Sequence, residues 1–450
     1  MLWLLLLPFA LAAPPDFEAT AADLLGRALA SDLPMERLTE LCDGIGPRLS
    51  GSEALDRALD WGEARMQADG LSTRRQEVMV PHWVRGEERL RLLAPQALDL
   101  PLLAIGNSIG TPKEGLEAEV VVVGSFEELE ARAPEVSGRI VLFDVPFTEY
   151  GETVAYRIEG PSAAARHGAV GALVRSIAPV GRRTVHTGTL RYAEDAPEIP
   201  AAAIAAEDAM RLRRLAEGGE TPRVHLYLGA HFLDDAPSAN VIGEIRGREH
   251  PEEIVLISCH IDSWDVGQGA HDDGAGCVMV MEAGRLLAAL PTPPRRTVRV
   301  VLFTNEENGR RGSLAYAAAT EDEPHFAAFE ADSGAGQPHG FAIDLRTGDE
   351  ETIARRTAAW AAWLTPVADL LAPLEASRLG PGFSGVDILP LAERGVLALG
   401  LDQDMSDYWP IHHTEADTLD KIDPVLLKRN TAAVTVLAWW LSEQPAPVVD

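Results

Sequence analysis

The chain has few cysteines, and this excludes a disulfide-stapled fold. Its 450 residues include only Cys42, Cys259 and Cys277. One disulfide bridge with one unpaired thiol is an alternative. Three reduced, buried thiols fit the pattern better, because Cys259 ends an apolar run and Cys277 lies in a helical pattern.

Basic residues are also scarce. Lys and Arg total 39 against 69 Asp and Glu, giving a formal net charge of −30, and no basic cluster interrupts this excess. A surface of this charge repels phosphate backbones, so nucleic-acid binding is excluded as the main function. The 39 glycines and 31 prolines are too few for a fibrous or low-complexity chain.

The chain also lacks apolar runs long enough to cross a membrane, which takes about 20 residues. The N-terminal segment MLWLLLLPFALAA is apolar but too short, and it contains the small-residue pattern Ala10-Leu11-Ala12. It predicts a cleaved signal peptide over residues 1–12, although no Lys or Arg precedes the apolar core. An uncleaved anchor or a start-site artefact is the alternative. We expect an exported protein, secreted or periplasmic, without stable membrane insertion after signal cleavage.

The length allows two or three domains. Hydrophobic spacing predicts one helix within 17–45, a second at 53–69 and strands over 74–94. Short buried strands at 119–124, 139–145 and 168–174 predict a smaller α/β domain inserted over 95–235. The main domain would then comprise 13–94 and 236–450.

The segment from Ser238 onward alternates between strands and helices. Strands are predicted at 241–245, 252–260, 297–304, 326–332 and 393–401, with helices at 276–290, 312–319 and 424–441. This order predicts an α/β fold with a doubly wound, mostly parallel sheet and helices on both faces.

Polar side chains follow the predicted strands. They are His260 and Asp262, Asp272 and Asp273, Glu306 and Glu307, Asp332, and the pair His412 and His413 before the last helix. Ligand sites of open α/β sheets lie outside the carboxyl ends of the strands. Each motif alone is typical of a surface pair, a turn or a helix cap. Their recurrence in five segments favours one site instead.

Imidazole and carboxylate side chains are the ligands that a pair of divalent metal ions needs. A shared carboxylate can bridge two Zn²⁺ ions about 3.5–4 Å apart. Such a pair polarises a carbonyl group and lowers the pKa of water, while a nearby Glu moves the proton.

The chain resembles the co-catalytic dizinc aminopeptidase family, which includes secreted leucyl aminopeptidases and folate hydrolases. The resemblance spans residues 238–443, and HIDSWDVGQGAHDDGAG, FTNEENGRRGS and HHTEADTLDKIDP are most similar to its plasma glutamate carboxypeptidase branch. Residues 95–235 resemble the protease-associated domain inserted in that branch.

The resemblance implies two Zn²⁺ ions and a set of residue roles. His260 and Asp332 would bind one ion, Glu307 and His413 the other, and Asp272 would bridge them. Glu306 would be the general base and acid. Asp262 would not bind metal itself but would orient the ring of His260. The Asp272–Asp273 peptide bond is commonly cis in this family.

The choice of His413 over His412 rests on spacing, because His413 precedes Asp417 by four residues, as the family pattern requires. His412 takes a position where some relatives place a Tyr near the scissile carbonyl. The oxyanion donor is therefore open: it is His412 or a group from elsewhere.

Three further residues are candidates for substrate contact. Ser384 and Asp387 lie in PGFSGVDILPL, which resembles a substrate-pocket loop, with a plain surface turn as the alternative. His186 in RRTVHTGTLRY could reach the site from the inserted domain, although a surface position is the simpler interpretation. Trp360, Trp363, Trp439 and Trp440 are expected to be packing residues.

Together these features predict an exported dizinc exopeptidase that hydrolyses dipeptides or short peptides with free termini. A non-catalytic binding module would lack metal ligands, and none is missing here. A glutaminyl cyclase-like acyltransferase typically uses one zinc and another ligand set. An endopeptidase is unsupported, because HExxH is absent. Side-chain preference, the terminus that is gripped, a homodimeric state, and Mn²⁺ or Co²⁺ in place of zinc are left open.

Overall fold

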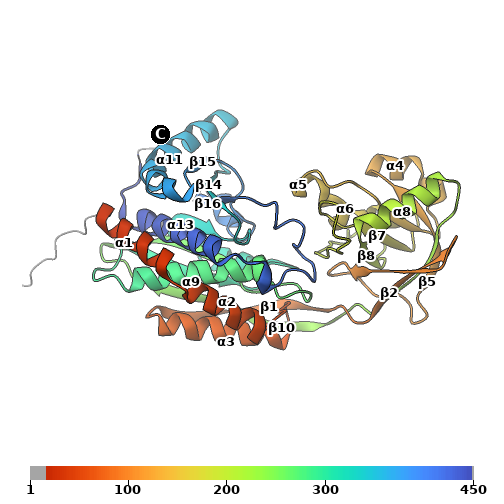
Figure 1. The fold of residues 1–450 in the computed structure, drawn as a ribbon, viewed down its shortest axis with the longest axis horizontal. Coiled ribbons are helices and arrows are strands. Elements are labelled where there is room, and N and C mark those ends of the chain that lie inside the picture. Colours follow the sequence, from red (N-terminus) through yellow and green to blue (C-terminus); the bar gives the residue numbers. More distant parts are fainter. Residues whose placement is uncertain (1–16, 448–450) are drawn as a thin grey trace, which may run out of the picture.

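The computed structural model describes residues 17–447, and the predicted signal peptide at 1–12 lies outside this range. Two eight-stranded mixed sheets, each with its own helices, form two domains that lie side by side (Figure 1). The predicted α/β class is confirmed. Cys42, Cys259 and Cys277 are free and buried, as expected. None of the described helices is long and apolar enough to cross a membrane.

The sheet of the first domain has four parallel strands at its centre. Its order is β1 (Ser72–Val84), β10 (His231–Ile245), β12 (Arg296–Phe303), β11 (His250–His260), β13 (His325–Glu330), β16 (Leu397–Gln403), β14 (Pro338–Asp344) and β15 (Arg378–Pro381). The parallel strands are β12, β11, β13 and β16. Strand β12 is buried along its whole length, as expected for a strand covered on both faces.

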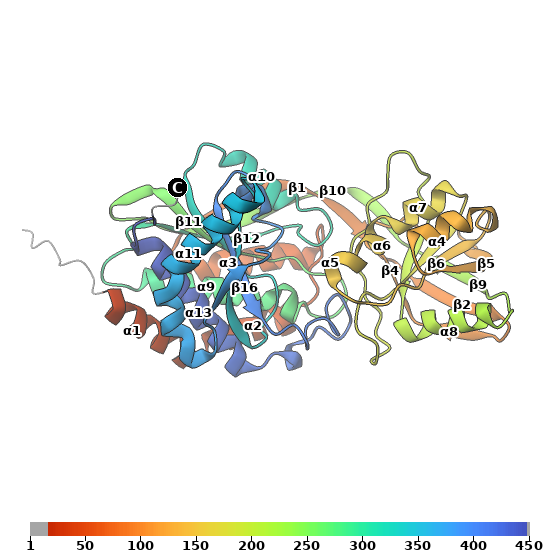
Figure 2. The same ribbon diagram turned by 90° about the horizontal axis from the view of Figure 1, so that it is seen from above.

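Helices cover both faces of this sheet (Figure 2). One face carries α1 (Phe17–Ala30), α2 (Leu33–Gly44), α3 (Glu53–Ala68), α9 (Ala275–Ala288), α11 (Glu350–Leu371) and α13 (Pro424–Glu443). The other carries α10 (Arg311–Ala319) and α12 (Leu389–Ala392). The prediction of one helix over 17–45 is wrong, because residues 31–32 are not helical and separate α1 from α2. Pro34 lies in the first turn of α2, where its missing N–H costs nothing.

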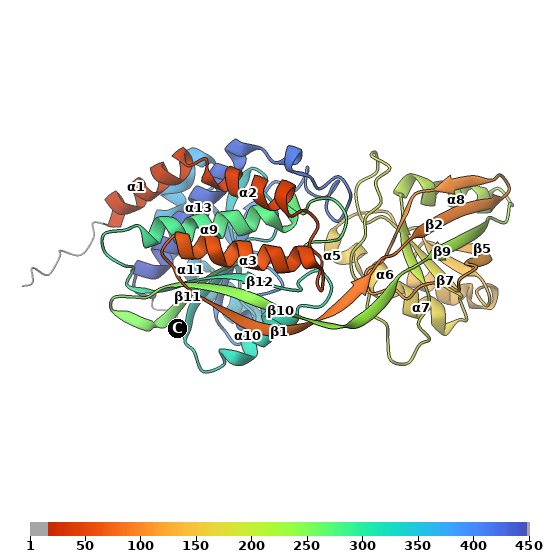
Figure 3. The ribbon, with the colours of Figure 1, turned by 90° about the horizontal axis from the view of Figure 1, so that it is seen from below.

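The second domain is inserted between β1 and β10, which pair with each other as a long antiparallel ribbon (Figure 3). Its sheet contains β3 (Leu98–Leu100), β2 (Glu88–Ala94), β9 (Arg223–Leu228), β5 (Leu116–Val123), β6 (Ile140–Phe143), β7 (Gly171–Arg175), β8 (Ala201–Ile204) and β4 (Leu102–Ala104). Its helices are α4 (Phe126–Ala131), α5 (Tyr150–Thr153), α6 (Ala155–Ile158), α7 (Gly160–Arg166) and α8 (Ala206–Glu217). Strand β2 lies before the predicted boundary at 95, yet it pairs with β9 in this second sheet.

Candidate metal centre

The candidate ligands meet at the carboxyl edge of the first sheet. His260 ends β11, Glu307 follows β12, and Asp332 follows β13. Asp272 lies in the one-turn helix η2 (Ala270–Gly274), and His413 lies in the loop before α13. The parallel strands thus bring residues that are up to 153 positions apart to one place, as the sequence predicts.

Asp272 lies between two pairs of potential ligands. Its Oδ1 is 3.2 Å from His260 Nε2, which is also 3.3 Å from Asp332 Oδ1. Its Oδ2 is 3.1 Å from His413 Nε2, which is 3.2 Å from Glu307 Oε2. One carboxylate therefore faces a His–Asp pair on one side and a His–Glu pair on the other. This is the arrangement that a bridging ligand needs.

The electrostatics of this cluster fit divalent cations. Burial raises the pKa of Glu307 well above its ordinary value, and it also raises the pKa of Asp332. Asp272 is buried too, but its hydrogen bonds to His260 and His413 hold its pKa well below the ordinary value. Crowded buried carboxylates with two imidazoles are a donor set for zinc, whose charge would relieve their repulsion.

Glu306 lies beside this cluster and lines the cavity above it. Its backbone N–H donates to Asp262 Oδ1 at 3.0 Å, and the next N–H, from Glu307, donates to Asp262 Oδ2 at 3.3 Å. Burial raises the pKa of the Glu306 carboxyl well above its ordinary value. The Asp262 carboxylate thus holds the backbone of both glutamates.

Asp262 meets His260 through its backbone rather than its side chain. The Nδ1 atom of His260 is 3.0 Å from the Asp262 carbonyl oxygen but 3.9 Å from the nearest carboxylate oxygen. A hydrogen bond to that carbonyl places the proton on Nδ1 and leaves Nε2 free for a metal ion. The predicted orienting role therefore falls on the main chain, while the carboxylate supports the Glu306–Glu307 turn.

Three further residues hold the loop that carries Asp272. Asp417 accepts the N–H groups of His271 at 2.8 Å and Asp272 at 3.1 Å. Asp273 accepts the His260 N–H at 3.2 Å, and the Asp272–Asp273 peptide bond is cis, as the resemblance implies. Arg48, fully buried, donates to the carbonyl oxygens of Ile261, Gln268 and Gly269. Sequence reasoning missed Arg48, because nothing local links it to residues more than 200 positions away.

His412, a candidate oxyanion donor, lies directly beside the metal-ligand cluster. Its Nε2 is 3.4 Å from Asp272 Oδ2, and its ring stacks on that of His413 with the centroids 3.5 Å apart. Burial lowers the pKa of His412 well below its ordinary value, so the ring is neutral. Either imidazole can therefore approach the same oxygen of Asp272.

A cavity of about 1340 Å³ lies over the cluster, and both domains line it. The inserted domain also contacts the two ligand loops directly. The Thr187 N–H donates to the carbonyl oxygen of His413 at 2.9 Å. The Asn107 side-chain amide donates to the carbonyl oxygen of Asn308, next to Glu307, at 3.1 Å. The inserted domain therefore braces the candidate metal centre as well as walling the cavity.

The three further candidates from the sequence do not line this cavity. Ser384 is buried and donates to Asp344, so its loop reaches the cavity through Phe383 and Val386 instead. Asp387, in the same loop, is also buried, and burial raises its pKa to about 7. His186 is buried too, not at the surface, and burial lowers its pKa to about 3.

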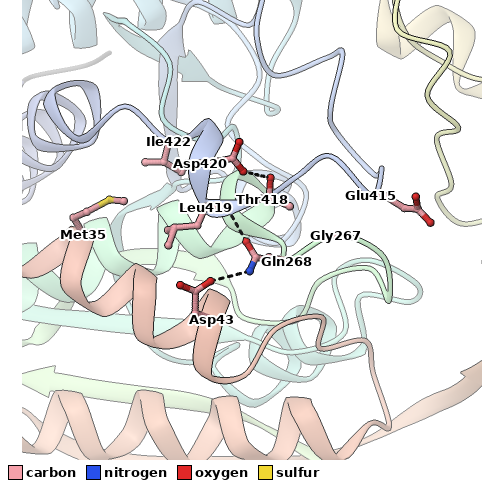
Figure 4. Close-up of a pocket in the computed structure, with 9 residues that line it drawn as sticks. All are labelled: Met35, Asp43, Gly267, Gln268, Glu415, Thr418, Leu419, Asp420 and Ile422. Carbon is pink, nitrogen blue, oxygen red and sulfur yellow. Dashed lines mark hydrogen bonds between the residues drawn. The ribbon is translucent and has the colours of Figure 1, made fainter.

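A second hollow of about 820 Å³ is lined by residues of α2, by Gly267 and Gln268, and by residues of the segment 415–422 (Figure 4). Gln268 crosses it, donating to Asp43 and accepting the N–H of Leu419. It shares no residue with the candidate ligands. Its lining residues include no histidine, so it does not offer the donor set of the metal centre.

Comparisons with known proteins agree with this geometry. Residues 240–438 match the family model described as peptidase family M28. The chain is 39% identical to carboxypeptidase Q of Mus musculus, over 91% of this chain and 85% of that protein. It is also 39% identical to carboxypeptidase Q of Xenopus laevis, over 95% of this chain and 90% of that protein. The chain belongs to peptidase family M28.

Within this family the chain lies in the carboxypeptidase Q-like branch and is a zinc-dependent exopeptidase. A crystal structure of a peptidase M28 precursor from Shewanella amazonensis is 36% identical with a TM-score of 0.89, covering 96% of this chain and 98% of the other. A zinc aminopeptidase from Bacillus subtilis shares the fold at 19% identity, with a TM-score of 0.67, covering 92% of this chain and 95% of the other.

Proposed function

We propose that this chain is an exported dizinc exopeptidase that hydrolyses dipeptides or short peptides with free termini. The observation that carries the proposal is the Asp272 carboxylate, with His260 and Asp332 on one side and His413 and Glu307 on the other. These five side chains would hold two zinc ions. When bound, the zinc ions would polarise the scissile carbonyl group and lower the pKa of the attacking water.

The other residues divide the remaining work. Glu306 takes the proton from the attacking water and passes it to the leaving amine as the C–N bond breaks. Asp262 holds the backbone of the turn that carries both this base and the ligand Glu307. Residues of both domains line the cavity, and this limits the access of bulk water to the reacting groups.

The charges around the cavity suggest how a peptide lies in it. The carboxylates of Glu306, Asp272 and Asp332 favour a free amino group near the metal centre. Arg310 and Arg378 line the cavity as well, and they can receive a free carboxylate. A dipeptide satisfies both ends. The name carboxypeptidase Q belongs to relatives, and removing the first residue of a dipeptide also removes its last.

The test is a panel of dipeptides supplied to the purified, zinc-loaded chain, with and without a chelator. For one dipeptide, kcat/KM is measured in the free, N-acetyl and C-amide forms. We expect the free form to be cleaved fastest, and N-acetylation to slow cleavage far more than amidation. Faster cleavage of the N-acetyl form would contradict binding of the free amino group near the metal centre and would support a strict carboxypeptidase. Conversion of an N-terminal Gln peptide to its pyroglutamyl form with release of ammonia, and without cleavage of a peptide bond, would indicate a cyclase.

Export rests on the apolar N-terminal segment with its Ala10-Leu11-Ala12 pattern. N-terminal sequencing of the protein recovered outside the cytoplasm tests this part. A new N-terminus near residue 13 is expected, and an intact Met1 on a cytoplasmic protein would contradict export.

A further inference from the structure

The inserted domain places an unusual cation beside the cavity. Arg157 is buried, yet among the described residues no carboxylate pairs with it. Its guanidinium donates to the carbonyl oxygens of Thr187 and Thr189, each at 3.2 Å, and to the hydroxyl of Tyr150 at 3.0 Å. Burying a charge without an opposite charge is costly, so a site that keeps one usually uses it.

The chain is shaped to hold this guanidinium. Gly188 lies between the two threonines with a φ of +131°, and a Cβ atom there would come within 2.1 Å of Arg157 Nη1. Any larger residue would displace Arg157. The position therefore requires glycine for both its backbone conformation and its space.

Tyr150 lies in α5, on the side of the inserted domain that faces the peptidase domain (Figures 1 and 2). Its ring stacks on Trp409 with the centroids 4.8 Å apart and meets His412 edge-on at 5.1 Å. It lines the same cavity as Asp272 and Glu306. Side chains of the peptidase domain therefore fix the ring of a tyrosine that the other domain supplies.

The hydrogen bond from Arg157 determines what the Tyr150 hydroxyl can do. A guanidinium only donates, so the phenol's own proton is left to point at another acceptor. Donation into the phenol oxygen also polarises the O–H bond and strengthens it as a donor. Burial raises the pKa of Tyr150, which keeps this proton in place.

We infer that Tyr150 donates the hydrogen bond that stabilises the oxyanion during peptide hydrolysis, and that Arg157 is its positioning residue. The inference rests on the proposed function, because it concerns the same reaction. When the water oxygen bonds to the carbonyl carbon, the electron pair of the C=O π bond moves to the carbonyl oxygen. Tyr150 donates to that oxygen without losing its proton, and Glu306 carries the water proton to the departing amine.

His412 and Tyr408 also line the cavity and lie close to Tyr150 and the metal centre. His412 already directs Nε2 toward Asp272 Oδ2 at 3.4 Å. Tyr408 has its ring 5.0 Å from that of His412, but none of the described residues forms a hydrogen bond with its hydroxyl. Between 17 and 447, Tyr150 is the tyrosine that combines a place in the cavity with a hydrogen bond from a buried cation, which fixes and polarises its O–H group.

The test compares Tyr150→Phe with Tyr156→Phe and Tyr408→Phe in the zinc-loaded chain. Tyr156 is the matched control, since it stacks on Phe126 in the same domain at 4.5 Å. We expect Tyr150→Phe to lower kcat/KM for a dipeptide about 10²–10³-fold, with KM and zinc content nearly unchanged. Tyr156→Phe should stay within a few-fold of the wild type.

A second readout separates oxyanion contact from a structural role. The affinity of Tyr150→Phe for a phosphinic dipeptide analogue, which mimics the tetrahedral intermediate, should fall by the same factor as kcat/KM. The affinity for the product amino acid should stay the same. Arg157→Met should reproduce part of the loss, and Arg157→Lys should recover some of it.

The outcomes that overturn the inference are distinct from failure of the proposed function. A wild type that hydrolyses dipeptides while Tyr150→Phe matches it would reject Tyr150 alone. A large loss in Tyr408→Phe without one in Tyr150→Phe, or parallel loss of analogue and product affinity, would also reject it. A zinc-loaded wild type with no peptidase activity would reject the proposed function itself.

Discussion

The carboxylate of Asp262 accepts the backbone N–H of Glu306 at 3.0 Å, so a buried side chain at the end of one strand fixes the candidate base that follows another. Its second oxygen accepts the N–H of Glu307 at 3.3 Å. One carboxylate therefore holds the backbone of both the candidate base and the neighbouring ligand.

Replacing Asp262 tests this support. Asp262→Ala leaves two buried N–H groups without acceptors and frees the turn, so we expect zinc affinity or kcat to fall about 10–100-fold. Zinc titration and dipeptide kinetics measure the two quantities. Asp420→Ala is the control, because Asp420 is exposed. Unchanged metal affinity and kinetics would show that Asp262 does not support the site.

Arg48 offers a test of stability. Arg48→Met would leave the carbonyl oxygens of Ile261, Gln268 and Gly269 without their donor in a buried setting. We expect the free energy of unfolding to drop by about 3–5 kcal/mol, measured by denaturant titration of the metal-free chain. Arg57→Met, at an exposed position of α3, should change it little. Equal stability of the two variants would contradict the bracing role.

Metal binding should stabilise the chain. Zinc relieves the repulsion among buried carboxylates and binds only the folded state, so saturation at about 1,000 times Kd adds about 4 kcal/mol. Elemental analysis should find two zinc ions per chain after loading, and a chelator should abolish activity and lower Tm. One ion or fewer per chain would count against the bridging role of Asp272.

The thiols give an independent check on burial. Burial raises the pKa of Cys42 to about 12, so the thiol stays protonated and unreactive at pH 8. We expect iodoacetamide to leave the native chain unmodified and to add three groups after unfolding without reductant. A single added group would reveal a bridge between Cys259 and Cys277, whose Sγ atoms lie 3.0 Å apart.

The sequence predicts where the candidate metal ligands meet, because their positions follow a local rule. His260, Glu307 and Asp332 each come after an apolar run that forms a parallel strand, and such strands end at one edge. Tyr150 and Arg157 had no such signal. They reach the cavity only because β1 and β10 turn a whole inserted domain toward it.

Part of the fold was also beyond local pattern. Helix α11 was not predicted, although it is 22 residues long, and Pro366 inside it is a residue that normally argues against a helix. Strand β15 has only four residues and lies at the sheet edge, where burial imposes a weak pattern. The boundary of the inserted domain depends on the pairing of β2 with β9, which no residue of β2 signals alone.

The central claim is that Glu306 moves the proton while Glu307 holds metal. The measurement is zinc content together with dipeptide turnover in Glu306→Gln and Glu307→Gln, each purified and loaded alongside the wild type. We predict that Glu306→Gln keeps two zinc ions per chain and loses turnover by at least about 10²–10⁴-fold, because an amide cannot carry the proton. Glu307→Gln should lose metal. Retained zinc in Glu307→Gln together with lost zinc in Glu306→Gln would contradict the assignment.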